Sequence, residues 1–159
     1  LKEITLPFKN PTSMVKVEDQ ILVSISGSYL IEPDSTRGIV SVNLTNGKST
    51  ILMTDLDLEG QPKQLFSNEQ GIFVRINKGY DDAFNSMDEL GRIDLQNNSV
   101  SLMKNLMLDG GMSYSSESNT WIIGHREPGK EGLTLITDGS VTSYTVSDIL
   151  APYQVLVTP

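Results

Sequence analysis

The 159-residue sequence predicts an all-β protein made of three similar units, each with four short antiparallel strands. Three observations support this prediction. Short runs rich in β-branched residues, such as 21–25 and 72–76, are bounded by Gly, Asn and Asp, which is the pattern of strands and turns. The chain repeats at an interval of about 50 residues. No window shows a helical period sustained over three turns.

The repeat is clearest when the chain is shifted by 51 residues. QILVSISGSY at 20–29 then matches GIFVRINKGY at 71–80, and VNLTNGKST at 42–50 matches IDLQNNSVS at 93–101. A fainter third copy begins with TWIIGH at 120–125. Four antiparallel strands in roughly 40 to 50 residues is the spacing of a β-propeller blade, so the units are predicted to be blades.

The strands of the first unit are expected at 13–17, 21–25, 39–44 and 50–54. The hairpin tips of the three units carry residue pairs that accept the positive φ of tight turns. These pairs are Asn46-Gly47, Asn97-Asn98 and Asp138-Gly139.

DLDLEG at 55–60 invites a comparison with a calcium loop, because its acidic residues alternate ahead of a glycine. It aligns with NLMLDG at 105–110, which keeps the two leucines, one acid and the glycine but loses the other two carboxylates. Phe66 also stands where a calcium loop places a bidentate Glu. We therefore expect each fourth strand to end by burying two leucines before a glycine turn, with no metal and no cofactor.

The whole chain, 1–159, is predicted to be a single β-propeller segment. Propellers close with about four to eight blades, so three blades need further blades to complete a ring. Two solutions stay open. Either a longer polypeptide supplies the missing blades, which the flanking strands favour, or a homodimer closes a six-bladed ring. The expected parts are blades at 10–58, 60–108 and 110–150, the outer strand of a preceding blade at 1–8, and the inner strand of a following blade at 153–157.

Two stretches carry a family resemblance. IVSVNLTNGKSTILM at 39–53 and LGRIDLQNNSVSLM at 90–103 place Asn43 and Asp94 where one group of repeats has its aspartate. The units thus resemble the YVTN or surface-layer type of β-propeller repeat. That resemblance implies an exported bacterial protein, in the periplasm or at the cell surface, that binds a ligand or partner.

Composition excludes several classes of function. Twelve basic and twenty acidic residues give a net charge of −8, which disfavours binding to nucleic acid or to anionic lipid. The absence of cysteine excludes thiol catalysis, disulfides and cysteine-ligated zinc. No apolar run approaches the ~20 residues that a membrane helix needs, so no membrane span is expected.

Two connections are longer than a turn requires, 26–38 and 77–91, and a shorter counterpart lies at 126–131. All three are expected on one face of the propeller, and long connections often carry function. Their aromatic rings and mixed charges suit a small polar ligand or a protein partner. The candidate binding residues on this face are Tyr29, Arg37, Lys78, Tyr80, Asp81, Asp82, His125 and Arg126.

A non-enzymatic binding module is the favoured function, and no catalytic residue is assigned. The alternative is a hydrolase or lyase that uses His125, the only histidine, with the loop carboxylates, although no G-x-S-x-G motif is present. Asp81, Asp82, Asp88 and Glu89 also form a calcium candidate, but four carboxylates in one loop are more often solvated. A structural propeller that spaces other domains is the third hypothesis.

Overall fold

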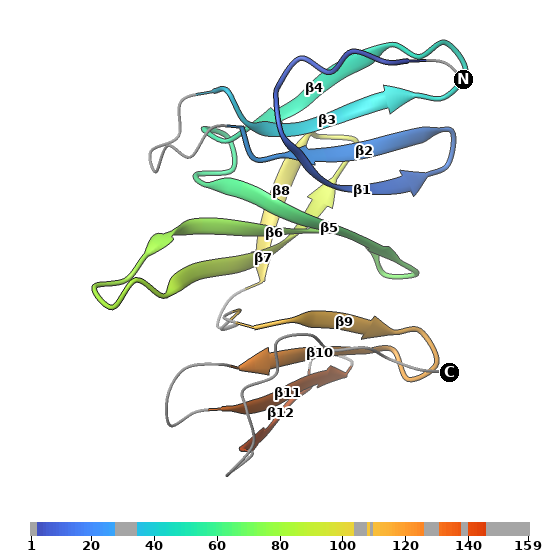
Figure 1. Cartoon of the computed structure of the whole chain (residues 1–159). Coiled ribbons are helices and arrows are strands. Elements are labelled where there is room, and N and C mark those ends of the chain that lie inside the picture. Colours follow the sequence, from blue (N-terminus) through green and yellow to red (C-terminus); the bar gives the residue numbers. More distant parts are fainter. Residues whose placement is uncertain are drawn as a thin grey trace.

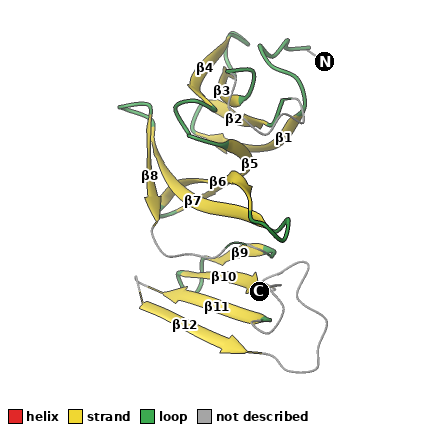
Figure 2. Ribbon diagram, turned by 90° about the vertical axis from the view of Figure 1, so that its left-hand side faces the viewer, coloured by secondary structure: helices red, strands yellow, loops and turns green. Residues whose placement is uncertain are grey.

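A computed structural model of the chain describes residues 3–27, 35–103, 108, 110–125, 131–137 and 140–145. The described residues form twelve β-strands in three four-stranded antiparallel sheets, and they contain no helix. The sheets lie one below another in Figure 1, and Figure 2 shows them as separate layers. The all-β, three-unit prediction is confirmed. Within the described ranges, nothing forms a helix of the length and apolarity that crossing a membrane requires.

Sheet 1 has the strand order β1-β2-β3-β4, so consecutive strands are neighbours. Its strands lie within two residues of the predicted positions. They are β1 (Pro11–Val17), β2 (Gln20–Ile25), β3 (Gly38–Asn43) and β4 (Ser49–Thr54). At the predicted tip, Gly47 has a φ of 74°, and the Asn43 side chain accepts hydrogen bonds from the backbone of Thr45 and Asn46, both at 3.0 Å.

Sheets 2 and 3 repeat this order of strands. Sheet 2 consists of β5 (Gln61–Asn68), β6 (Gly71–Tyr80), β7 (Ser86–Asp94) and β8 (Ser99–Met103), and sheet 3 of β9 (Met112–Ser115), β10 (Thr120–His125), β11 (Gly132–Thr137) and β12 (Ser140–Thr145). The tip of sheet 2 places Asn98 at a φ of 48°, as its sequence predicts. The predicted tip at 138–139 lies outside the described residues.

Sheet 2 uses both of its faces, because successive residues of a strand point to opposite sides. Val74 and Ile76 of β6 are fully buried in one apolar cluster with Leu22 of sheet 1. Phe73, which precedes Val74 and points to the opposite face of the strand, is buried in a second cluster with Trp121 of sheet 3. Because alternate side chains of β6 pack against sheet 1 and sheet 3, sheet 2 is the middle layer of the stack.

Trp121 is the centre of the contact between sheets 2 and 3. Its ring lies edge-on to Phe73 and Phe66 of sheet 2, with centroids 4.9 Å and 5.7 Å apart, and tilted against Tyr114 at 5.0 Å. Such ring pairs each contribute about 0.5–1.5 kcal/mol beyond the burial of their area. The indole is 1% exposed, so it is part of the core.

The first strands of sheets 1 and 2, β1 and β5, pack against each other. Polar contacts fix this junction. The Leu65 backbone N–H donates to the Ser13 hydroxyl at 3.1 Å, and the fully buried Ser24 hydroxyl donates to the Lys63 carbonyl at 3.3 Å. The first bond joins β1 to β5, and the second joins β2 to β5.

The connection from β4 to β5 differs from its prediction, because it buries one leucine and not two. Leu58 is 3% exposed in the cluster between sheets 1 and 2, whereas Leu56 is 54% exposed. The strand ends at Thr54 and a turn follows, closed by hydrogen bonds from Leu58 N–H to the Thr54 carbonyl and from Gly60 N–H to the Asp55 carbonyl. Strand alternation no longer applies inside the turn, so Leu56 lies on its outer side.

The carboxylates of this connection have protein partners. Asp57 accepts hydrogen bonds from the backbone N–H and the hydroxyl of Thr54, both at 2.8 Å, and these bonds lower the pKa of Asp57. Asp55 is buried and paired with Arg37. Local turn formation and ion pairing thus account for the acidic pattern of DLDLEG.

The strand predicted over 1–8 is not formed by residues 3–8, which run as an extended and bent segment. Leu6 and Phe8 pack on the outer face of sheet 1, against a cluster that includes Val23 and Val40. The Thr5 carbonyl accepts a hydrogen bond from the Ser49 hydroxyl. Leu6 and Phe8 cover this apolar face, and burying them there stabilises the bent segment more than pairing it as a strand would. The predicted strand at 153–157 lies outside the described residues.

Candidate functional site

The ends of β2, β6 and β10 point to the same side of the stack, on the left in Figure 1. Arg37, Tyr80 and His125 lie at or beside strand ends on this side, as their positions in the repeat predict. Tyr29 and Arg126 fall outside the described residues. The remaining candidates differ widely in exposure and in their hydrogen-bond and ion-pair partners.

The segment 77–91, expected as a long loop, is mostly a β-hairpin. β6 extends to Tyr80 and β7 begins at Ser86, which leaves a turn at 81–85. Polar side chains support the extension: the Asn77 amide donates to the Ser86 hydroxyl at 2.7 Å and to the Asp88 carboxylate at 2.8 Å. The hairpin projects beyond the neighbouring sheets (Figure 1). The loop prediction is wrong here, because hydrogen bonds between polar side chains hold these residues in a hairpin that lacks the apolar alternation of a strand.

Asp81 organises the turn of this hairpin. Its carboxylate accepts hydrogen bonds from the Asn85 side chain at 2.9 Å, the Asn85 backbone at 2.7 Å and the Ala83 backbone at 2.9 Å. The bonds from Asn85 are the main cause that lowers the pKa of Asp81. Phe84 is held at a φ of 62°, a conformation that side chains rarely adopt. Asp82, next to Asp81, is exposed.

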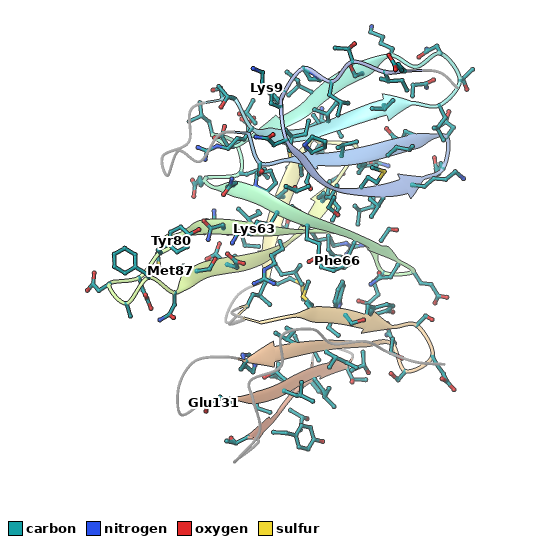
Figure 3. All side chains as sticks on the ribbon, viewed as in Figure 1. Lys9, Lys63, Phe66, Tyr80, Met87 and Glu131 are labelled. Carbon is teal, nitrogen blue, oxygen red and sulfur yellow. The ribbon has the colours of Figure 1, made fainter. Side chains whose placement is uncertain are left out.

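Three large apolar side chains are exposed on this hairpin. Phe84 is 85% exposed, Tyr80 50% and Met87 46%. Figure 3 labels Tyr80 and Met87 on the projecting part, away from the sheet packing. We call residues 80–87 the hairpin tip. Sequence reasoning identified Tyr80 alone. The missed signal was a pair of apolar residues, Phe84 and Met87, inside an otherwise polar segment.

Lys78 lies at the base of the hairpin and is not a free cation. Its ammonium group donates to the Leu58 carbonyl at 2.8 Å and lies 3.7 Å from Glu89 and 3.9 Å from Glu59. Only 18% of its side chain is exposed. Lys78 thus ties the hairpin to the connection between sheets 1 and 2.

Arg37, one of the candidate binding residues, is 1% exposed and lies below the surface. Its Nε lies 2.7 Å from Oδ2 of Asp55, which is fully buried. The other Asp55 oxygen accepts the backbone N–H of Ser35 at 2.8 Å. The ion pair joins the start of β3 to the end of β4. A buried charge requires such a partner, and the spacing of Arg37 and Asp55 in sequence did not reveal it.

His125 ends β10, and its Nε2 lies 2.6 Å from the Thr134 hydroxyl, which lies 2.9 Å from the Ser143 hydroxyl. The alternative function needs this imidazole beside the loop carboxylates. Within the described part of the chain, no hydrogen bond or ion pair joins His125 to Asp81 or Asp88. His125 ends β10 of sheet 3, whereas Asp81 and Asp88 belong to the β6–β7 hairpin of sheet 2.

Asp88 is the buried member of the predicted carboxylate group, with 5% exposure. Its oxygens accept hydrogen bonds from Asn77 and Ser86, and they lie 2.5 Å from Arg75 Nε and 3.2 Å from Lys63 Nζ. Burial opposes ionisation, but the Ser86 bond, the Arg75 charge, the Asn77 bond and the Lys63 charge outweigh it and lower the pKa of Asp88. Asp88 thus faces inward, away from the turn that Asp81 holds.

No family model matches the chain, and no curated protein matches it in sequence.

Proposed function

We propose that this chain is a non-enzymatic binding module that docks a protein partner through the hairpin tip. The observation that carries the proposal is the group of Tyr80, Phe84 and Met87, exposed together on a hairpin that projects from the stacked sheets. Exposed apolar side chains that gather in one patch are a feature of protein interaction sites.

The hairpin is suited to docking because its turn is already ordered. Backbone hydrogen bonds from Ala83 and Asn85 to the Asp81 carboxylate hold the chain on both sides of Phe84, and the Asn85 side chain adds a third bond. A preorganised anchor loses little conformational entropy on binding. Burying an exposed Phe side chain contributes about 1.5–3 kcal/mol, which is the size of an interface hot spot. Asp81 and Asp82 belong to the same exposed turn as Phe84, so the matching partner is proposed to have an apolar pocket with a basic rim.

The three sheets are proposed to be blades of a β-propeller of the YVTN or surface-layer type, in an exported bacterial protein of the periplasm or cell surface. The repeat of about 50 residues and the two-sided packing of sheet 2 support this architecture. Among the described residues, sheets 1 and 3 each meet another sheet on one face only. Blades from further polypeptide are proposed to complete the ring.

Light scattering tests how the ring is closed. If further polypeptide supplies the missing blades, this chain alone has a solution mass of 17.5 kDa. A stable species of twice that mass would contradict the proposal and favour the six-bladed homodimer.

The docking proposal is tested with Phe84→Asn. Asparagine tolerates the positive φ of this position, so the variant removes the exposed ring without straining the turn. The control is Leu44→Asn, which removes a 44% exposed leucine from the turn that follows β3, on the opposite side of the sheets.

Each protein is immobilised and exposed to an extract of the source cells, and retained proteins are quantified by mass spectrometry. We expect the wild type and Leu44→Asn to retain the same partner protein. The amount retained on Phe84→Asn should be lower by about tenfold or more, which is the effect of one hot-spot contact. Equal retention on all three proteins would refute docking through the hairpin tip.

A further inference from the structure

The first strands of sheets 1 and 2 each contain a bulge at the same point of the repeat. The register of β1 against β2 shifts between Pro11 and Ser13, and that of β5 against β6 shifts between Pro62 and Gln64. Thr12 and Lys63 are the extra residues, and they lie 51 positions apart, the shift of the sequence repeat. Bulges re-aim side chains and are common beside functional sites.

A pocket of about 410 Å³ lies where these two bulged strands meet. Its volume falls within the range of small-molecule sites, about 300–1,000 Å³. It lies apart from the hairpin tip, at the base of the same hairpin; Figure 3 labels Lys63 on sheet 2, away from Tyr80 and Met87. The pocket is lined by Thr12, Ser13, Lys63, Gln64, Arg75 and Asp88.

The pocket carries one surplus positive charge. Asp88 is ionised, and Arg75 neutralises it at 2.5 Å while Asn77 and Ser86 occupy its remaining acceptor positions. Lys63 adds a second cation at 3.2 Å and keeps 33% of its side chain exposed to solvent. In a chain with a net charge of −8, a cationic pocket does not follow from overall composition.

Hydrogen-bond donors converge on the same space. Ser13 Oγ already accepts the Leu65 N–H, so its own hydroxyl hydrogen is left to donate. Lys63 Nζ donates to the Ser86 hydroxyl at 2.8 Å and lies 3.2 Å and 3.5 Å from the two oxygens of Asp88. One hydrogen shared between these two carboxylate oxygens leaves the third hydrogen of the ammonium group for the pocket. The Gln64 side chain is exposed and adds an amide donor.

We propose that this pocket binds the carboxylate group of a small organic acid. Lys63 supplies the charge, and Ser13 and Gln64 supply neutral hydrogen bonds. A singly charged group balances the surplus charge, whereas a phosphate dianion would add a second negative charge beside buried Asp88. The bulge at Lys63 places the Lys63 and Gln64 side chains toward one space, which regular alternation along β5 would prevent.

The test is an NMR titration of the ¹⁵N-labelled chain with propionate at pH 7 and constant ionic strength. We expect saturable shifts at the amides of residues 12, 13, 63 and 64. Lys63→Met is expected to weaken binding about tenfold or more, since a charge-assisted hydrogen bond contributes about 1.5–3 kcal/mol. Lys16→Met is the control, because Lys16 is an exposed lysine of β1 outside the pocket.

Gln64→Ala provides a second variant at an exposed position where loss of folding is not expected, and we expect it to weaken binding several-fold. Neutral propionamide should cause no saturable shift. Undiminished propionate binding by Lys63→Met, or shifts confined to other residues, would overturn the site. Tighter binding of inorganic phosphate than of propionate would overturn the carboxylate assignment.

Discussion

Asp88 shows how a polar residue can be built into the packing of sheet 2. Its carboxylate is the common acceptor for Arg75, Asn77, Ser86 and Lys63. Arg75 in turn donates to the carbonyls of Leu108 and Gly110, at 2.6 Å and 2.7 Å, in the connection toward sheet 3. One buried carboxylate thus positions a cation that links two sheets.

Replacing Asp88 by Asn is expected to destabilise the fold by about 3 kcal/mol, because it leaves Arg75 and Lys63 without their counter-charge. The control is Asp94→Asn at the end of the same strand. Asp94 is exposed and accepts hydrogen bonds from the backbone of Gln96 and Asn97, which an asparagine oxygen also accepts. The variant loses only the bond from the Asn97 side chain to Oδ2, which lies in an exposed turn where water replaces it. Urea unfolding midpoints should therefore fall for Asp88→Asn and stay unchanged for Asp94→Asn.

The same comparison has a pH signature. The pKa of Asp88 is lower in the folded state than its ordinary value of 3.8. Between these two pKa values the unfolded state therefore binds more protons than the folded state, so acid favours unfolding. The stabilisation by ionised Asp88 is complete above the ordinary value and is lost as the pH falls through the lowered pKa. The stability gap between wild type and Asp88→Asn should therefore narrow in acid. A gap that stays constant from pH 6 to the acid limit of folding would contradict this assignment.

At the residue scale the sequence predicted positions better than partners. Arg37 and Tyr80 were both placed near strand ends, but Arg37 is buried against Asp55 whereas Tyr80 is exposed. The sequence around Arg37 does not show whether Asp55, eighteen positions later, will pair with it in the core. That outcome depends on tertiary packing, which determines the burial of both groups.

Among the elements, the β6–β7 hairpin departs most from its prediction. β-branched residues and turn pairs located β1 to β4 closely, because each strand of sheet 1 has the residue types that suit a strand. The outer part of the hairpin, 77–88, is held by side-chain hydrogen bonds of Asn77 and by the Asp81 turn. The residues that make these bonds are polar and show no periodic apolar pattern, so the sequence predicts a loop at this position.

Asp81→Ala tests whether the hairpin tip is preorganised. The variant removes the acceptor for Ala83 and Asn85, so the amides of these two residues should exchange hydrogen faster than in the wild type. The global unfolding midpoint should not change, because the turn is exposed and lies outside the apolar clusters. Asp82→Ala is the matched control and should leave exchange as it is. Unchanged exchange in Asp81→Ala would show that other contacts order the turn.

Across the whole molecule, the repeat in the sequence predicted the number of sheets and their strand order. It could not predict which faces meet. That follows from the alternation on β6, where Phe73 packs toward sheet 3 and its neighbour Val74 toward sheet 1. It also could not predict that Leu6 and Phe8 cover the outer face of sheet 1, because this cover uses residues outside the repeat.

The central structural claim is that opposite faces of sheet 2 contact two different sheets. The most direct test is a nuclear Overhauser experiment on the folded chain, observing the Trp121 ring and the Val74 methyl groups. We expect cross-peaks from Trp121 to Phe73 and Phe66, and from Val74 to residues of its cluster such as Leu22. Cross-peaks between Val74 and Trp121 would contradict it, because both would then lie on one face.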